Sequence, residues 1–413
     1  MVQQSPTLSR RSLIAIATTL TGGAAIGIRD VLAAPPDVAH LPASQSGTPA
    51  ISADSAIGSL LARSYDPGTG LVDQLPIIAM YADLDLATAG VGIERPPVGA
   101  SDSDISYWSR MLTGVAFPQS FAYLLTPEWK QYTGCDIAQI SQTIEIGEPP
   151  DMVSLLAGAF DRETAITAWS DGGYAKIEDD GEIAIYSIAE DAEISLTNPI
   201  QKTFLARRNN AAIIGDELIV FASTLDLMRK AIASATGNAT PLGSAPGVVA
   251  LLASTPELAS GAFASGSSLQ TIPPGFAGLS PDEAATAIAD TQEQTPVPPI
   301  LLALIGVTPG GPMPTSDSSG EATPIPTPET ATLELSLLMA SDEDAQNAID
   351  LLDERLKTAI SYRVRQPFTE WFTSWDLSVA EDAPIARLSI ELQNCYPKIW
   401  MDLLFSSDFS FLW

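Results

Sequence analysis

The sequence predicts an α+β protein made of two related ββαββ units, with mostly antiparallel sheets and with helices packed on one face. Apolar strand-like runs pass directly into helix-like runs at four places, namely 152–161, 217–226, 247–257 and 333–344. Hairpin signals flank these junctions, and the stretch 342–360 carries apolar residues at the spacing of one helix face. These observations indicate strands that pair with their sequence neighbours and helices that cover the resulting sheets.

The junctions are predicted helix starts. Ser223, Ser254 and Ser341 each end a strand-like run, and an acidic residue follows each of them three positions later. A serine hydroxyl accepts a backbone N–H of the first helical turn, and an acid at the third helical position completes a capping box. We therefore expect these three serines to be helix N-caps, and we expect Asp161 to serve the same purpose in the first unit.

The first half of the chain is expected over residues 58–240. It opens with a helix at 55–64, a strand at 76–83 and an amphipathic helix at 104–113. The first ββαββ unit follows, with a helix at 161–169 and strands at 140–147, 152–158, 172–178 and 182–188. Its turns contain Pro-Pro and Asp-Gly pairs, which favour tight connections. A further hairpin, 211–214 with 217–222, leads into a helix at 225–235 that Gly237 ends.

The second half is expected over residues 241–413. Its unit consists of the helix at 342–360 and strands at 300–307, 332–340, 377–380 and 385–392. The insertion at 309–330 is rich in Pro, Ser, Thr and Gly and predicts disorder, because it has little apolar surface to bury. Shorter helices are expected at 280–290 and 397–404. Two unrelated α+β layers are the alternative to a duplication.

Charge and histidine content exclude several classes of function. The 413 residues include 50 acidic and 20 basic ones, for a formal net charge of −30, so nucleic-acid partners and anionic lipid surfaces are not expected. The one histidine, His40, lies outside the expected folded body, which excludes histidine-based triads and multi-histidine zinc sites there. With two cysteines and no phosphate-binding motif, we expect no cofactor, no metal and no catalytic residue.

The N-terminus carries an export pattern. The run Ser9-Arg10-Arg11-Ser12-Leu13-Ile14 precedes a weakly apolar segment, and Val31-Leu32-Ala33 offers small residues for cleavage. This stretch resembles the twin-arginine (Tat) export signal, although Leu13 stands where that pattern usually has Phe. The resemblance implies a signal peptide at 1–33 and an extracellular or cell-surface protein, with 34–57 as a flexible tether. An uncleaved membrane anchor is the alternative, and it would be the protein's one contact with the membrane.

The two cysteines flank the units. Cys135 precedes the first unit and Cys395 follows the second. A small, even number of cysteines in an exported protein predicts a disulfide, which would link the two halves over a long loop. Two buried free thiols are the alternative.

Acidic residues supply the remaining chemical candidates. The pairs Asp83/Asp85 and Asp102/Asp104 offer the two carboxylates that a glycosidase-type hydrolase needs. The acidic turn at 178–182 offers oxygen ligands for calcium, although without the spacing of a known calcium loop. Solvated turns and helix caps explain all three groups equally well, since the chain holds 50 acidic residues.

One group of aromatic residues is the candidate binding surface. It consists of Trp371, Phe372, Trp375 and Trp400, with Arg363 and Arg365 beside them. Aromatic and arginine side chains near loops suit a groove for a sugar or a peptide, and packing into the core is the alternative.

The sequence thus predicts a non-enzymatic binding or scaffold module at the cell envelope, with an extracytoplasmic partner or ligand that the sequence does not specify. A carboxylate-based hydrolase of external polysaccharide is the first alternative. A carrier of lipids or other hydrophobic molecules is the second.

Overall fold

The computed structural model describes residues 56–68, 75–112, 127–191, 193–204, 206–270, 294–309, 330–361, 365–393, 399–406 and 408–412, together with residues 286 and 289. The predicted signal and tether, residues 1–57, lie outside these ranges except for residues 56 and 57. Nearly all of the predicted insertion at 309–330 and of the predicted helix at 280–290 also lies outside them.

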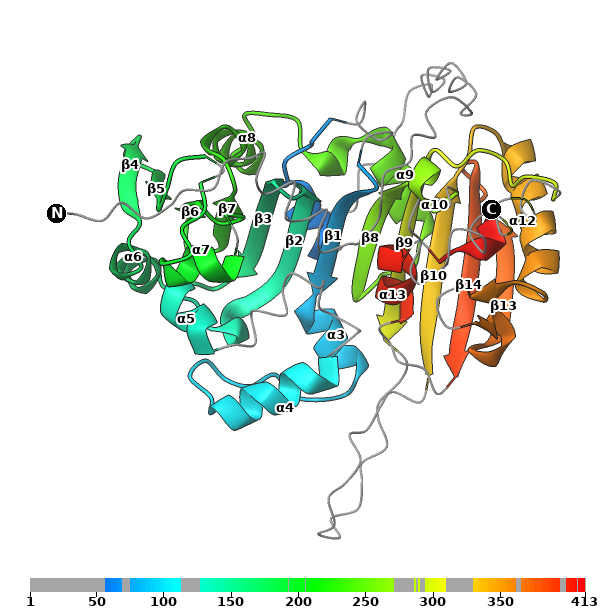
Figure 1. Ribbon diagram of the computed structural model, residues 1–413, viewed down its shortest axis with the longest axis horizontal. Coiled ribbons are helices and arrows are strands. Elements are labelled where there is room, and N and C mark those ends of the chain that lie inside the picture. The colour runs from blue at the N-terminus through cyan, green and yellow to red at the C-terminus, as the bar shows by residue number, and fades with distance from the viewer. Residues whose placement is uncertain are drawn as a thin grey trace, which may run out of the picture.

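Twelve of the described strands form one sheet (Figure 1). They are β1 (Ile77–Asp83), β2 (Ile140–Glu148), β3 (Asp151–Gly158), β4 (Ala175–Asp179), β5 (Ala184–Ser187), β6 (Asn210–Ile214), β7 (Leu218–Ala222), β8 (Ser260–Ser265), β9 (Leu302–Pro309), β10 (Thr330–Leu338), β13 (Phe372–Val379) and β14 (Ile385–Gln393). Their order is β13-β14-β10-β9-β8-β1-β2-β3-β7-β6-β5-β4, and every pairing is antiparallel. A small separate ladder joins β11 (Ile360–Ser361) to β12 (Gln366–Pro367).

The described helices connect and cover these strands. They are α2 (Ala56–Leu61), α3 (Leu84–Gly90), α4 (Asp102–Leu112), α5 (Pro127–Thr133), α6 (Arg162–Asp171), α7 (Pro199–Phe204), α8 (Leu225–Ala235), α9 (Pro246–Ser254), α10 (Gly266–Leu269), α12 (Asp342–Leu356) and α13 (Ile399–Ser406). The structure therefore has the predicted α+β class. Among the described residues, no helix combines the length and the apolar character that crossing a bilayer requires.

The two predicted halves share this sheet. All strands from β1 to β7 belong to residues 58–240, all strands of the sheet from β8 onward belong to 241–413, and the β1–β8 pairing joins them. Counted outward from that pairing, the order is β1-β2-β3-β7-β6 in the first half and β8-β9-β10-β14-β13 in the second. In both halves a helix, α6 or α12, follows the third strand. The order of strands thus repeats about the centre of the sheet.

The repeat differs from the predicted one in a single hairpin. The prediction matched β4–β5 with β13–β14, because both hairpins follow the helix directly in the sequence. In the structure β7 lies beside β3, so β6–β7 takes the place of β13–β14, and β4–β5 is an additional hairpin at the sheet edge. Sequence order alone does not reveal which hairpin returns to the third strand.

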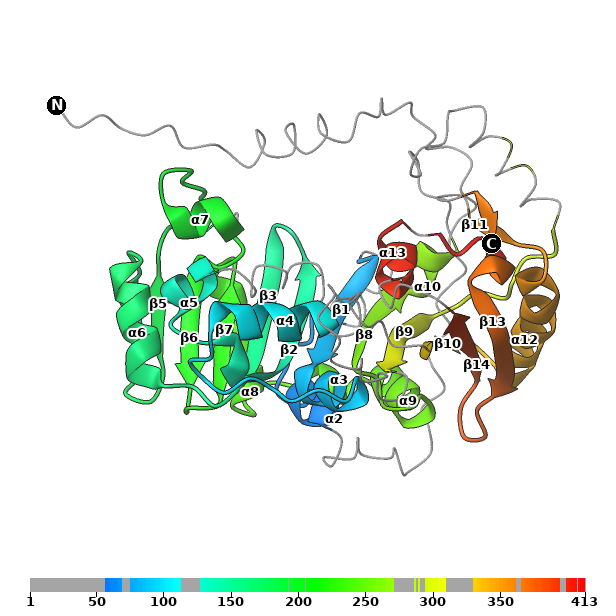
Figure 2. The ribbon, with the colours of Figure 1, turned by 90° about the horizontal axis from the view of Figure 1, so that it is seen from below.

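Helices cover both faces of the sheet, so the prediction of one covered face is wrong. The helices α6 and α12 lie on the same face, which we call the α6 face, together with α3, α4, α5, α7 and α13. The helices α2, α8 and α9 pack on the opposite face, which we call the α8 face. Figure 2 shows α8 and α9 on the other side of the sheet from α7 and α13. The central strands are consequently buried from both sides.

Two of the four predicted caps are confirmed. Asp161 accepts the Thr164 N–H at the start of α6, and Ser341 accepts the Asp344 N–H at the start of α12. Ser223 is not a cap, because its hydroxyl accepts the Met152 N–H of strand β3 and the neighbouring Thr224 caps α8. Ser254 is not a cap either, because the run before it forms the helix α9 and not a strand.

Candidate functional site

The predicted aromatic binding surface is largely part of the core. Phe372 and Trp400 are 2% and 0% exposed, so neither belongs to a surface and the prediction is wrong for both. Trp371 and Trp375 are half-buried and pack against the core, and Trp375 donates a hydrogen bond of 3.1 Å to Asp353. Arg365 is exposed, whereas Arg363 lies outside the described residues. Phe372 and Trp400 pack into the core instead, as the alternative interpretation has it.

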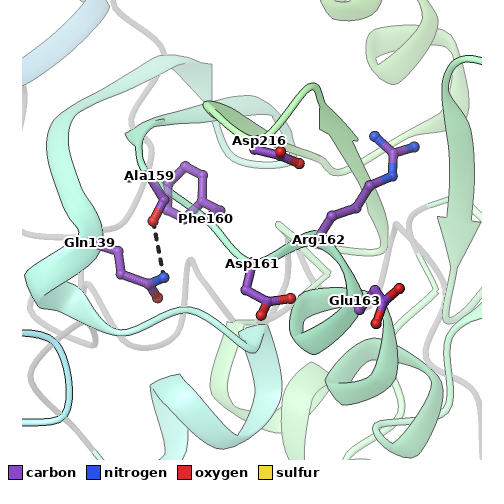
Figure 3. A pocket seen from close by; sticks show the side chains of 7 residues that line it. All are labelled: Gln139, Ala159, Phe160, Asp161, Arg162, Glu163 and Asp216. Carbon is purple, nitrogen blue, oxygen red and sulfur yellow. Dashed lines mark hydrogen bonds between the residues drawn. The ribbon is translucent and has the colours of Figure 1, made fainter.

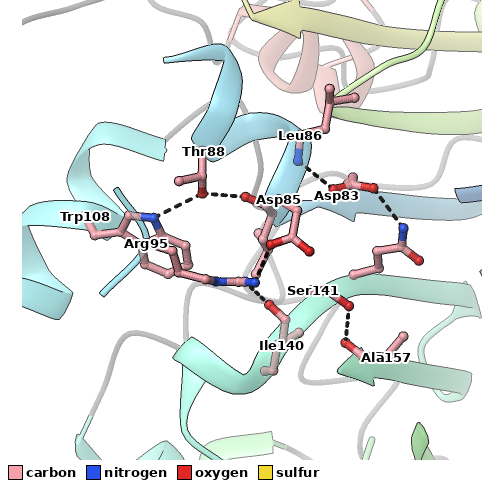
Figure 4. Close-up of polar contacts among 11 residues, drawn as sticks. Asp83, Asp85, Leu86, Thr88, Arg95, Trp108, Ile140, Ser141 and Ala157 are labelled. Atoms are coloured by element: carbon pink, nitrogen blue, oxygen red, sulfur yellow. Dashed lines mark hydrogen bonds and ion pairs between the residues drawn. The ribbon is translucent and has the colours of Figure 1, made fainter. Parts of the chain in front are cut away.

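The predicted pair Asp83/Asp85 has structural partners (Figure 4). Asp83 is 2% exposed and caps α3 by accepting the Leu86 N–H, and its second oxygen accepts the Gln142 amide at 2.8 Å. Asp85 pairs with Arg95, whose guanidinium also donates to the Ile140 carbonyl and stacks on Trp108. Burial raises the pKa of Asp85, and Arg95 opposes that rise. Both carboxylates therefore hold the fold together around the end of β1.

The other acidic candidates are also committed to local structure. Asp102 and Asp104 are exposed in the first turn of α4. In the turn predicted to hold calcium, Glu178 pairs with Arg229, Asp179 pairs with Lys176, and Asp180 accepts two backbone N–H groups. Within the described ranges, no group of three or more acidic, cysteine or histidine side chains could hold a metal ion.

A surface depression of about 640 Å³ lies at the start of α6 (Figure 3). Its lining includes Asp161, Arg162 and Asp216. Asp161 is the helix cap, and Arg162 donates to the Ile213 and Glu182 carbonyls at 3.3 and 3.2 Å. Asp161 and Arg162 therefore already have partners within the fold.

A different set of side chains lies buried on the α6 face with hydrogen-bonding atoms that lack partners. Its centre is Arg208, which is 3% exposed. The Arg208 guanidinium carbon lies 4.3 Å from the centre of the Trp129 ring, 4.4 Å from that of Phe204 and 4.9 Å from that of Phe221. These rings come from α5, α7 and β7, so three elements enclose the cation. Its Nη1 atom is buried and donates no hydrogen bond.

Two further buried atoms on the same face lack a strong partner. The indole Nε1 of Trp129, the residue that stacks on Arg208, has no oxygen or nitrogen acceptor and has only the thiol of Cys135, a weak acceptor, as a partner. The hydroxyl of Thr143 on strand β2 is also buried without a partner. Buried polar groups in proteins are nearly always hydrogen-bonded, and each exception costs roughly 1–3 kcal/mol. The described residues of the first half hold four such atoms, the fourth being the Nε of Arg95 in the Asp85–Arg95 pair.

A carboxylic acid completes the set. Glu145 on β2 is 7% exposed, and one of its oxygens accepts a hydrogen bond of 3.4 Å from Ser154 on β3. Burial raises the pKa of Glu145 to about 7, and the positive charges of Arg208 and Arg207 oppose that rise. Burial also lowers the pKa of Arg208, to about 10, so the guanidinium stays charged near neutral pH. We call Arg208, Trp129, Thr143, Glu145 and Ser154 the Arg208 cluster.

Cys135 lies beside this cluster. Burial raises the pKa of its thiol to about 11, against the influence of Thr133, Trp129 and Arg208. The thiol is therefore protonated near neutral pH. Cys395, its predicted partner, lies outside the described residues, so the disulfide stays a prediction.

The two halves differ at the positions of the cluster. One row of paired residues on the α6 face crosses the sheet through Met80 and Ala262, the partners at the β1–β8 junction. Outward into the first half the row continues with Glu145, Ser154 and Phe221. Outward into the second half it continues with the apolar residues Ile305, Leu335 and Leu388. The fold accommodates an entirely apolar row, so it does not itself require Glu145 and Ser154.

This arrangement is suited to binding a polar group. The Nη1 of Arg208 and the Nε1 of Trp129 can only donate hydrogen bonds, and the Thr143 hydroxyl can donate as well. A molecule with acceptor oxygens beside Arg208 and Trp129 would give both donors a strong partner. The sequence did not reveal the cluster, because Trp129, Thr143 and Arg208 are far apart in the chain. The only local signal was Thr143 and Glu145 within the strand ISQTIEIGE, where alternation suggests a solvated face.

Comparisons with known proteins add no functional assignment. No protein-family model matches the chain, and no curated protein matches it. A solved structure, crystal form I of TP0453, is 12% identical with a TM-score of 0.34, and the match covers 85% of this chain and 98% of that chain.

Proposed function

We propose that this protein is an exported, non-enzymatic binding protein whose ligand site is the Arg208 cluster. The observation that carries the proposal is the buried Nη1 of Arg208, a charged donor without an acceptor. A protein core gains nothing from such an atom, whereas a bound molecule that accepts its hydrogen bond removes the cost of burying it. The apolar row of the second half supports a functional origin for the polar residues of the first.

Mass spectrometry of the mature protein tests the binding role. We expect the native protein, isolated without denaturation, to carry a mass excess that denaturation releases. The variant Arg208→Met removes the charged donor and keeps a long side chain, so it should lack that excess. Arg229→Met, a change at an exposed arginine of the same half, should retain it. Equal native and denatured masses for the wild type, even after incubation with concentrated culture medium, would contradict the proposal.

The export part of the proposal rests on Arg10 and Arg11 and has its own test. Replacing both with lysine should leave the precursor inside the cell, because the signal that the sequence resembles depends on the arginine pair. Arg29→Lys, outside the pair, should be exported like the wild type. Unchanged export of the double variant would rule out this route.

A further inference from the structure

The chemistry of the Arg208 cluster indicates a class of ligand. We propose that the cluster binds the oxyanion group of a small molecule, either a carboxylate or a tetrahedral anion such as a sulfate or phosphate. This inference rests on the proposed binding function and makes it specific.

The first argument is the kind of atom left without a strong acceptor. The Nη1 of Arg208 and the Nε1 of Trp129 have a hydrogen to give and no lone pair to offer. A ligand that contacts both must present acceptor atoms. Hydrogen bonds from a guanidinium are shortest and strongest when the acceptor is itself an anion, so an oxyanion gains more here than a neutral carbonyl does.

The second argument is charge. Arg208 and the half-buried Arg207 both act on Glu145, and Glu145 is the only carboxylate whose charge opposes an anion within the cluster. With Glu145 protonated, the cluster carries net positive charge and gains another hydrogen-bond donor. Of the remaining titratable groups that face Arg208, Cys135 has a pKa raised to about 11, and burial raises the pKa of Tyr174 as well. Neither group loses its proton near pH 7.

These two arguments give a pH dependence. Anion binding requires the protonated form of Glu145, whose pKa is about 7. Above that pH, each bound anion must be accompanied by one proton, so the affinity should fall about tenfold for each further pH unit. The variant Glu145→Gln keeps a neutral side chain of the same shape with an N–H donor, so its affinity should not depend on pH. Glu334→Gln, at a buried glutamate on the α8 face of the second half, should behave like the wild type.

Isothermal titration calorimetry of the mature protein tests these expectations between pH 6 and pH 8.5. The probes are sulfate, acetate and acetamide, which has the shape of acetate without its charge. We expect one or both anions to bind, acetamide to bind far more weakly, and Arg208→Met to abolish binding. The variants Trp129→Phe and Thr143→Val each remove one donor from a nearly unchanged volume, and each should weaken binding about two- to tenfold. They supply the test if Arg208→Met does not fold.

Several results would overturn the inference. One is that neither anion binds at pH 6, and another is that acetate and acetamide bind equally well. A third is that Arg208→Met still binds the anions, and a fourth is that both Trp129→Phe and Thr143→Val bind them with unchanged affinity. An affinity that rises with pH would overturn it too. If the mass-spectrometric experiment released a neutral molecule, the proposed binding function would be supported and the oxyanion class of ligand would be contradicted. The two proposals can therefore be tested separately.

Discussion

Arg208 and Glu145 are ionisable residues in the interior of one half of the sheet. Such residues are rarely buried without a partner, because removing a charge from water costs several kcal/mol. The three aromatic rings around Arg208 return part of that cost through cation–π contacts. The remaining cost falls on the unpaired Nη1, which is why a ligand is the simplest explanation of the residue.

Glu145 makes the stability of the ligand-free protein depend on pH. Its pKa is raised from 4.5 to about 7 in the folded protein, so the unfolded chain releases this proton first as pH rises. The free energy of unfolding should therefore fall between pH 4.5 and 7, by about 3 kcal/mol from this group. In Glu145→Gln the free energy of unfolding should not show this decrease of about 3 kcal/mol between pH 4.5 and 7. Urea denaturation across this pH range measures it.

The matched control is Glu163→Gln, a change at an exposed glutamate in α6. Its unfolding profile should follow the wild-type curve. A Glu145→Gln profile that also follows the wild-type curve would show that Glu145 is not buried as described.

At the scale of single elements, Ser341 and Ser254 look alike in the sequence and differ in the structure. Ser341 caps α12, so Ser341→Ala should lower the free energy of unfolding by about 1 kcal/mol. Ser254 ends α9 and starts no helix, so Ser254→Ala should change it by less than about 0.5 kcal/mol. Thermal unfolding of the two variants measures this difference in stability. Equal losses of stability in both variants would show that the Ser341 cap does not stabilise the fold.

The sequence predicted most of the strands and the long helices, because local signals define them. The helix α12 has an apolar stripe, and the predicted helix at 225–235 has the observed bounds of α8. The run 247–254 is predicted as a strand but forms the helix α9, since a short apolar run does not distinguish a buried strand from a buried helix, although Pro246 directly before it favours a helix start. Strand β8, SGAFAS, was not predicted, because small residues are poor strand formers and only its central position buries them all.

The candidate site could not be predicted in the same way. Thr143 and Glu145 alternate with apolar residues in β2, a pattern typical of a strand with one solvated face. That face is covered instead by helices that include α5 and α6. Only long-range packing decides this, and a single sequence carries no direct signal of it. The aromatic residues near the C-terminus stood out by composition, yet Phe372 and Trp400 fill the core.

At the scale of the whole molecule, one continuous sheet joins the two halves through β1 and β8. The same order of strands appears on both sides of this junction, although only the first half holds the Arg208 cluster. The proposed binding function therefore rests on a difference between the two halves and not on their shared architecture.

The predicted disulfide would add a covalent link between the halves. Because export leads to an oxidising environment, we expect Cys135 and Cys395 to be joined. Thiol titration of the mature, denatured and unreduced protein should then detect no free thiol, and two thiols should appear after reduction. Two free thiols before reduction would show that Cys135 is a buried, unlinked core residue, as its raised pKa also allows.

The most direct measurement is a crystal structure of the mature protein as isolated, at a resolution that separates water from larger molecules. The binding function predicts density for a non-water group within hydrogen-bonding distance, about 2.7–3.2 Å, of the Arg208 Nη1 and the Trp129 Nε1. Separate ordered waters on these atoms, or an Arg208 paired directly with Glu145 in a closed core, would contradict it.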